Sequence, residues 1–453
     1  MRVGTPETGS GQQGMGNATS PVRHGGGRRL VIAALAFTVS LLAYAVYLSR
    51  HHELSWYDLD VYNDAGRIVR SQPGSLYSWH LPHETDIKFT YTPFAGLVFA
   101  LASELGVGVL HWLMTVASIA ALPVIAWLTF RQLGWSSRSR LTGTLAVTAL
   151  CLWLEPVIRA LHLGQIEILL MLLIVWDLGQ SDRRWWKGAG IGVAAAIKMV
   201  PLIFIPYLIL CGKIRQAVVA SATVAVTILI GFAVLPHASV KWWLTGYFLH
   251  AGNTGDVGSL VNQSLYAVIA RAMGGATQAT PVWLVVAVGV GVIGLAAAAA
   301  LYRRGYPVEG WLTCAITGLL VSPISWDQHW VWVIPVLVVL VHRAVRAGGL
   351  ARVGYLASIV AVAVVYGGWP QHWTWSSDFA IYYGMIGFNV GPHPQDEIYH
   401  LHGSQLIIWN IFAVAGLVML AVAVAAAARA WRAHGATGGS QPASLPHQVN
   451  PTT

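Results

Sequence analysis

The chain has 453 residues, of which 56% are hydrophobic and only 10% are charged, and its formal net charge at pH 7 is +9. An ordinary soluble domain is about 25% charged, so this composition excludes a soluble globular fold. The basic residues gather beside apolar segments, which indicates the rims of a membrane domain next to anionic lipid and argues against a nucleic-acid partner.

Apolar segments long enough to cross a bilayer recur along the chain. A transmembrane helix needs about 20 mainly apolar residues, and such segments lie at 30–48, 218–235, 282–301 and 406–428. The pattern predicts an all-α membrane protein with about 12 transmembrane helices, provided that residues 91–106 and 262–276 form half-membrane or re-entrant pieces. Residues 188–211 hold Lys198 and Pro201 near their middle, so we expect two short helices that meet at a break.

The basic residues also predict the orientation. Seven clusters of Lys and Arg flank the apolar segments, and the positive-inside rule places them in the cytoplasm. The loops on the other side, the largest at about 51–90, 237–262 and 369–403, carry most of the acidic residues. We therefore predict a single membrane domain over residues 28–432. Disordered cytoplasmic tails are expected at 1–27 and 433–453, which are rich in Gly, Ser, Gln, Pro and Thr.

The first polar segment beyond the first span, residues 55–67, is predicted to be helical. Asp60, Asp64 and Arg67 fall on one face of that helix, where opposite charges can offset one another. Asp58 falls on a different face together with Tyr62 and has no cationic partner in its own helix. Position alone does not distinguish Asp58 from an ordinary solvated loop carboxylate.

Four further polar segments lie where the predicted outer loops meet the membrane. Their candidate residues are Lys88 and Tyr91, then Gln165 and Glu167, then Asn262, Gln263 and Arg271, and finally Trp326, Gln328 and His329. An ionisable group in or beside hydrocarbon is costly and tends to mark a pathway or a site. Lys198 is the expected neutralising partner of Glu167, and a purely structural ion pair explains those two residues equally well.

Six short motifs occur in order along the chain. They are Asp58-x-x-Val61-Tyr62 with Ala65-Gly66, Phe89-Thr90-Tyr91-x-Pro93-Phe94, Gly164-Gln165, Ala196-Ile197-Lys198-x-x-Pro201, Asn262-Gln263-Ser264, and Ser322-Pro323-x-Ser325-Trp326-x-x-His329. As an ordered set over about residues 30–430, they resemble the actinobacterial polyprenol-phosphate-sugar glycosyltransferases of the GT-C class, glycosyltransferase family 87. One departure is that family members often carry paired histidines in the last motif, whereas this chain has Gln328-His329.

The resemblance implies a GT-C-type multispanning helical bundle of the plasma membrane, with re-entrant or interfacial helices in the outer loops and an active site on the extracytoplasmic face. The implied enzyme is an α-(1→2)-mannosyltransferase that moves mannose from polyprenyl-phosphate mannose to a glycolipid acceptor, a phosphatidylinositol mannoside or lipomannan or lipoarabinomannan. The implied mechanism inverts the anomeric carbon. Because no diphosphate leaves, neither a metal nor another cofactor is expected.

The resemblance also suggests roles for the candidate residues. Asp58 is expected to be the general base, and His329 is expected to act beside the leaving phosphate. Substrate-binding roles are expected for Tyr62, Lys88, Tyr91, Gln165, Glu167, Lys198, Asn262, Gln263, Arg271, Trp326 and Gln328. Two alternatives remain: an arabinofuranosyltransferase with a decaprenyl-phosphate donor, and a transporter or flippase for a lipid-linked sugar.

Overall fold

The computed structural model describes residues 25–51, 54–79, 88–368, 384–386 and 398–436. Most of the predicted tails and of the 369–403 loop lie outside these ranges. The first helix begins at Gly25 and the last helix ends at Ala436, and the domain bounds 28–432 stay a prediction.

The described residues form helices joined by short loops, with two isolated β-bridges, Leu154 with Gly367 and Asn262 with Trp326. The α-helices are α1 (Gly25–His51), α2 (Tyr57–Ser71), α3 (Pro93–Ala102), α4 (Val107–Gln132), α5 (Ser137–Cys151), α6 (Glu155–Leu163), α7 (Glu167–Leu178), α8 (Ala189–Ile197), α9 (Phe204–Leu210), α10 (Ile214–Val234), α11 (Pro236–Ser239), α12 (Leu265–Met273), α13 (Ala276–Arg303), α14 (Pro307–Val321), α15 (Val333–Arg346), α16 (Gly349–Val365), α18 (Gln405–Ile408) and α19 (Ile411–Ala436). Among the short helical turns, η3 (Val200–Ile203) and η7 (Asp327–Trp332) matter most for the site.

Six helices of the described chain are long and apolar enough to span a membrane, or seven if the bent pair α6 and α7 counts as one span. The axes of α6 and α7 meet at 116°. Four further apolar segments have only 10–17 residues, which is short of the roughly 20 that a bilayer requires. The chain is therefore a multi-pass membrane protein, and the figure of about 12 spans stays a prediction.

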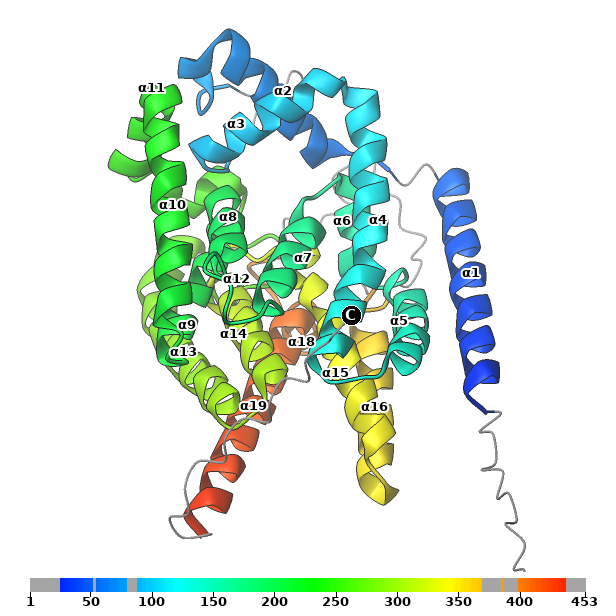
Figure 1. The fold of residues 1–453 in the computed structure, drawn as a ribbon. Coiled ribbons are helices and arrows are strands. Elements are labelled where there is room, and N and C mark those ends of the chain that lie inside the picture. The colour runs from blue at the N-terminus through cyan, green and yellow to red at the C-terminus, as the bar shows by residue number, and fades with distance from the viewer. Residues whose placement is uncertain (1–24, 52–53, 80–87, 369–383, 387–397, 437–453) are drawn as a thin grey trace, which may run out of the picture.

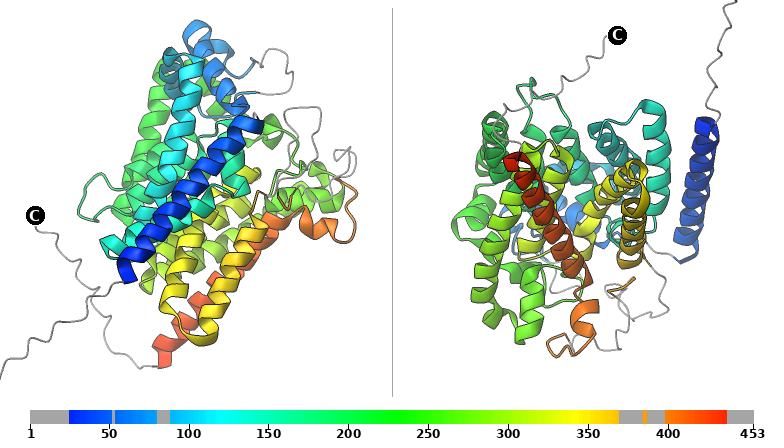
Figure 2. Two further views of the ribbon diagram at one scale, coloured as in Figure 1. Left: turned by 90° about the vertical axis from the view of Figure 1, so that its right-hand side faces the viewer. Right: turned by 90° about the horizontal axis from the view of Figure 1, so that it is seen from below.

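The long helices expose apolar side chains on the outside of the bundle. Leu229 of α10 is 67% exposed and Val285 of α13 is 75% exposed, as expected for side chains that face lipid. Helix α1 lies at the edge of the molecule beside α5, as the view from below shows (Figure 2). These outer helix faces are therefore surrounded by the hydrocarbon of the membrane rather than by water.

The helix ends divide the molecule into two sides. The N-terminal end of α1 and the C-terminal end of α19, which both carry arginines, point to the lower side of Figure 1. Helices α2 and α3 lie across the upper side (Figure 1). The acidic segment around Asp58 and the basic ends of the spans therefore lie on opposite sides, in agreement with the predicted separation of charge.

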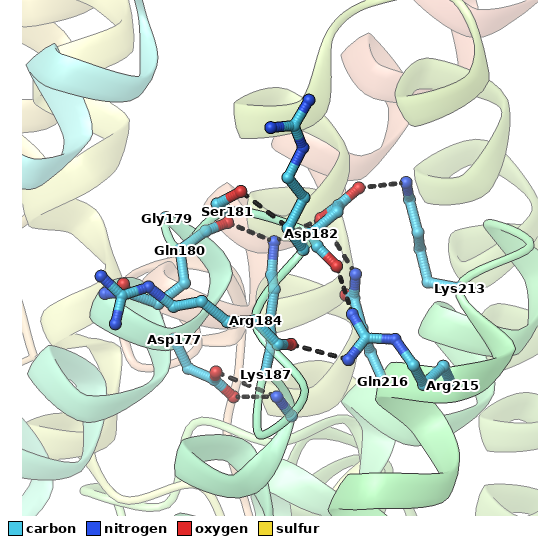
Figure 3. Close-up of polar contacts among 12 residues, drawn as sticks. Asp177, Gly179, Gln180, Ser181, Asp182, Arg184, Lys187, Lys213, Arg215 and Gln216 are labelled. Atoms are coloured by element: carbon cyan, nitrogen blue, oxygen red, sulfur yellow. Dashed lines mark hydrogen bonds and ion pairs between the residues drawn. The ribbon is translucent and has the colours of Figure 1, made fainter. Parts of the chain in front are cut away.

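A polar cluster holds the loop between α7 and α8 against the start of α10 (Figure 3). Asp182 accepts hydrogen bonds from Lys187 Nζ at 2.8 Å, Lys213 Nζ at 2.5 Å and Gln216 Nε2 at 3.0 Å. Burial alone would raise the pKa of Asp182, but the two lysines outweigh it and lower the pKa to about 2. The Asp182 carboxylate is thus charged at neutral pH and joins two segments of the chain.

Helix α8 begins beside this cluster and is held in place at its first turn. Both Asp177 carboxylate oxygens accept the Gly188 N–H at 3.0 Å, and one also accepts the Ile191 N–H at 3.0 Å. Gly188 has φ +111°, and a Cβ there would lie 2.2 Å from the Gln216 carbonyl oxygen. Only glycine permits this approach of α8 to α10.

The predicted break in the segment 188–211 is confirmed. Helix α8 ends at Ile197, and Lys198 has extended backbone angles (φ −133°, ψ 130°) before the turn η3 and helix α9 follow. Pro201 lies in η3. The break directs the Lys198 side chain away from the helix axis at a point inside the membrane domain.

The division of charge between the two sides gives a test of topology. A cysteine at the exposed Ser78 should react with a membrane-impermeant thiol reagent in intact cells, whereas a cysteine at the exposed Arg183 should react only after the cells are opened. The native cysteines, Cys151, Cys211 and Cys314, are buried. Labelling of the unsubstituted protein therefore measures the background reaction with the reagent. Equal labelling of both variants in intact cells would contradict the predicted orientation.

Candidate active site

The start of α2 is fixed to the end of α6. The backbone N–H groups of Ser55 and Trp56 both donate to the His162 carbonyl, at 3.1 and 2.9 Å. Trp56 has a left-handed conformation (φ 49°, ψ 24°), the single non-glycine residue with positive φ in the described part of the chain. Such strain persists only where the surroundings hold it. It places Asp58 in the first turn of α2, over the junction of α6 and α7.

Asp58 begins a network of hydrogen-bonded side chains. Its carboxylate accepts a hydrogen bond from the Gln165 amide nitrogen. The Gln165 amide oxygen in turn accepts from the hydroxyls of Tyr62 at 2.8 Å and Tyr91 at 3.2 Å, and these two hydroxyls lie 2.5 Å apart. Side chains from three separate segments of the chain are thus joined, and one N–H of the Gln165 amide is bound to the carboxylate.

The network continues to a buried group of charged side chains. Lys198 Nζ forms an ion pair with Glu167 and lies 2.9 Å from His329 Nε2 and 3.4 Å from the Tyr91 hydroxyl. The Lys198 side chain is 18% exposed and the Glu167 side chain 7%. The predicted neutralisation of Glu167 by Lys198 is confirmed.

The geometry assigns the tautomer of His329. With Lys198 as the ammonium partner of Glu167, His329 Nε2 is assigned as the acceptor and Nδ1 as the protonated ring nitrogen, and Nε2 also lies 3.3 Å from Glu167 Oε1. His329 is 6% exposed, and its Nδ1 has no hydrogen-bond partner among the described residues. The imidazole therefore holds an uncommitted donor next to a cation.

A cavity opens beside these three polar side chains. Glu167, Lys198 and His329 lie on its wall, and the other lining side chains are almost all apolar, among them Met171, Phe204 and Trp332. Its walls come from α7, the segment after α8, the start of α9, α14 and η7. A polar group beside Glu167, Lys198 and His329 would meet charged side chains, and a hydrocarbon chain along the remaining walls would meet apolar ones.

Burial changes the acidity of Asp58. Its side chain is half-buried, and burial raises the pKa of Asp58 to about 6, against the lowering effects of Gln165, Lys198 and Arg159. A carboxylate with this pKa is still mainly ionised at neutral pH, but it accepts a proton more readily than a solvated one. The arrangement can therefore support general base chemistry.

A second group of predicted residues lies in a different part of the structure. Arg271 is 1% exposed and donates to the carbonyls of Gly258, Ser259 and Asn262 and to the Asn410 side chain. With every donor bound within the chain, its guanidinium acts as a clamp between the segment before α12 and the start of α19. A substrate-binding role for Arg271 stays a prediction, and the contacts by themselves support a structural one.

Asn262 and Gln263 strengthen the same clamp. The Asn262 side chain donates to the carbonyl of Val257 and accepts from the Ser325 N–H, and the Gln263 side chain donates to the carbonyls of Leu260 and Trp409. Trp326 forms a backbone β-bridge with Asn262. Gln328, which directly precedes His329 in the chain, is buried. These residues hold the loop that carries His329.

Lys88 is half-buried at the start of a described segment, and the described residues show no hydrogen bond between it and the Asp58 network. Its predicted phosphate-binding role stays a prediction.

One pairing near Asp58 agrees with the helical spacing, and others were not foreseen from the sequence. Arg67 lies 3.9 Å from Asp64, whereas Asp60 pairs with His111 Nε2 of α4 at 2.6 Å. The helical spacing correctly separated Asp58 from these acids but could not show that α4 packs against α2. In addition, Arg159 of α6 forms an ion pair with Asp327 of η7 at 3.5 Å, and these two residues are far apart in the sequence.

No group of three or more His, Cys, Asp or Glu side chains in the described part of the chain is arranged to hold a metal ion.

Comparison with known proteins gives a family match. The pattern of Glycosyltransferase family 87 matches residues 89–323, more than half of the chain. This range contains most of the network, from Tyr91 through Gln165 and Glu167 to Lys198. It also contains the clamp residues Asn262 and Gln263.

Curated relatives share about 30% of their residues with the chain. A polyprenol-phosphate-mannose-dependent alpha-(1-2)-phosphatidylinositol pentamannoside mannosyltransferase of Mycobacterium tuberculosis is 31% identical over 65% of this chain and 68% of its own length. A protein of the same name from Mycolicibacterium smegmatis is 30% identical over 75% of this chain and 84% of its own length. A polyprenol-phosphate-mannose-dependent alpha-(1-2)-phosphatidylinositol mannoside mannosyltransferase of Mycobacterium tuberculosis is 28% identical, with 76% and 85% covered. No solved structure matches the chain.

The buried ion pair makes a prediction about stability. Lys198→Met leaves the Glu167 carboxylate buried without its cation, which costs about 3–5 kcal/mol in proteins. The double variant Lys198→Met/Glu167→Gln removes both charges and should recover much of that loss. Thermal unfolding of the purified proteins in detergent measures both effects. If the double variant is no more stable than Lys198→Met, the stability loss does not come from the unpaired Glu167 charge.

Proposed function

Because the chain belongs to glycosyltransferase family 87, we propose that it transfers mannose from polyprenyl-phosphate mannose to a phosphatidylinositol mannoside through an α-(1→2) linkage. Family membership makes the chain a glycosyltransferase rather than a transporter. The mannose donor and the glycolipid acceptor are proposed from the names of the curated relatives. For the same reason mannose is preferred over arabinofuranose.

The observation that carries the proposal is the joining of Asp58 to Lys198 and His329 at the wall of a largely apolar cavity. A polyprenyl-phosphate sugar has an anionic phosphate between a sugar and a long hydrocarbon chain. The cation and the imidazole suit the phosphate, and the apolar walls suit the beginning of the prenyl chain. With the phosphate and the prenyl chain placed in this way, the sugar of the donor lies toward Asp58.

In the proposed reaction an acceptor hydroxyl attacks the anomeric carbon of the donor while the bond from that carbon to the phosphate oxygen breaks. Asp58 takes the hydroxyl proton, and the bonding electrons leave with the polyprenyl phosphate, which gains one negative charge. Attack and departure on opposite faces invert the anomeric carbon. The Gln165 amide orients the Asp58 carboxylate, and Tyr62 and Tyr91 orient the amide.

In this mechanism Lys198, with the His329 imidazole beside it, stabilises the charge that develops on the leaving phosphate. A donor aimed at developing charge in a water-poor site contributes more than the same donor in water. This mechanism uses one imidazole, so it does not require the second histidine that family members often carry where this chain has Gln328. We place the reaction on the extracytoplasmic face of the plasma membrane, the side of α2 and α3.

The test of the base is Asp58→Asn. Asparagine keeps the size of the side chain and can accept the Gln165 hydrogen bond, but it cannot take the hydroxyl proton. Single-turnover transfer from polyprenyl-phosphate mannose should fall by roughly 10²–10⁴-fold, while donor affinity should be retained because a carboxylate does not attract the phosphate. Asp64→Asn on the same helix, whose partner is Arg67, is the matched control and should stay active. Normal turnover by Asp58→Asn would rule out Asp58 as the general base.

The raised pKa of Asp58 predicts the pH dependence. The base is active when ionised, so kcat/KM should rise with pH up to about 6 and become level above about 7. Below the pKa, each unit of pH should lower the rate about tenfold. A profile that is already level at pH 5 would show that burial does not act on the catalytic group.

A further inference from the structure

Helix α4 holds the start of α2 through two residues near its N-terminal end, contacts that the proposed mechanism does not use. The indole N–H of Trp56 donates to the Thr115 hydroxyl at 3.0 Å. The Trp56 ring stacks on the His111 imidazole, with the ring centroids 4.5 Å apart and the planes inclined by 10°. His111 Nε2 also pairs with Asp60 Oδ1 at 2.6 Å. We call His111 and Thr115 the α4 bracket.

The α4 bracket follows the helical period on both helices. His111 and Thr115 are four residues apart on α4. Trp56 and Asp60 are also four apart, and the Asp60 N–H donates to the Trp56 carbonyl at 2.8 Å. Residues four apart lie on the same face of a helix, so α4 holds α2 at two points one turn apart. Asp58 lies between these points in the sequence, and because two residues turn a helix by about 200°, it lies on the opposite face.

The turn between α6 and α7 packs against the start of α2 from another side. Gly164 lies in this turn with φ +70°, and a Cβ there would lie 2.7 Å from Leu59 Cβ and 3.4 Å from Trp56 Cδ1. The turn therefore approaches α2 as closely as a glycine allows. The next residue, Gln165, donates to the Asp58 carboxylate. The start of α2 is thus enclosed between α4 and this turn.

The backbone of Trp56 requires such support. Its φ of 49° and ψ of 24° are in the left-handed region, which a bulky residue rarely adopts. Trp56 is also the N-cap of α2, a position where the backbone is usually extended and a short polar side chain caps the helix. Its own side chain instead bonds to α4. The local sequence therefore does not favour this start of α2, and contacts from other helices hold it.

We propose that Trp56 is a positioning residue for the base. The α4 bracket fixes the indole, the indole fixes the first turn of α2, and that turn sets where the Asp58 carboxylate lies relative to the acceptor hydroxyl. The inference rests on the proposed function. A misplacement of about 1 Å can cost about 100-fold in rate. Donor binding is not affected, because the donor phosphate lies beside Lys198 and His329 in the proposed mechanism.

The experiment measures single-turnover transfer from polyprenyl-phosphate mannose together with the Kd of this donor. Trp56→Phe keeps an aromatic ring for the stack but removes the indole N–H, and Thr115→Val removes the acceptor of that N–H. Each variant should lower the transfer rate by roughly tenfold or more, while the donor Kd stays at the wild-type value. Thr115→Ser keeps the hydroxyl and should transfer at the wild-type rate. The double variant Trp56→Phe/Thr115→Val should be no slower than the slower single variant, since both changes remove the same hydrogen bond.

Coupling to Asp58 separates positioning from a general loss of structure. Trp56→Phe should cause no further fall in the residual transfer by Asp58→Asn, because Trp56 acts through the base. The matched control is Trp153→Phe. The Trp153 indole N–H likewise donates to a hydroxyl, that of Ser40 on α1, at 2.9 Å, but this bond joins α1 to the end of α5. Trp153→Phe should lower the Tm by an amount similar to Trp56→Phe and leave the transfer rate unchanged.

An equal fall in rate on adding Trp56→Phe to wild type and to Asp58→Asn would overturn the inference, as would wild-type rates for both Trp56→Phe and Thr115→Val. Neither result affects the base assignment as long as Asp58→Asn is impaired in transfer. If Asp58→Asn turns over normally, the proposed mechanism fails instead. Should Trp56→Phe not fold, Thr115→Val and Thr115→Ser give the same comparison from the α4 side of the bond.

Discussion

The need to balance charge inside a membrane domain is the constraint on which the rest of the structure depends. Lys198, Glu167 and His329 meet in a region built from apolar helices, and each is kept there by the others. A single buried charge would neutralise or draw in water, whereas a compact group of opposite charges can remain. The backbone break after α8 is what brings Lys198 to this point.

The balance of charge also explains how the helices around the site are arranged. The sharp bend between α6 and α7 brings Arg159 and Glu167 to the same region from two short helices. A straight span would place residues eight positions apart about 12 Å from each other along its axis. Broken helices thus gather polar groups at one depth, and the long helices α4, α10 and α13 supply the surface toward lipid.

The described residues contain two polar clusters with different roles, the Arg271 clamp and the Asp58 network. The Arg271 clamp has its donors bound to backbone carbonyls and to Asn410, so it fixes the loops. The Asp58 network instead reaches a cavity, whose wall includes Glu167, Lys198 and His329. The clamp holds the loop of η7, and η7 carries His329 and Asp327, so the clamp positions residues of the proposed site.

The sequence by itself determined the membrane class, the family resemblance and most members of the network, because composition, apolar length and local motifs are properties of short stretches. Helical spacing separated Asp58 from Asp60 and Asp64, and Pro201 with Lys198 marked the break. Only the tertiary structure decided that Asp60 pairs with His111, that Arg159 pairs with Asp327, and that Arg271 lies in a clamp. These contacts join helices that are far apart in the chain, and their formation depends on how helices pack, which no local pattern encodes.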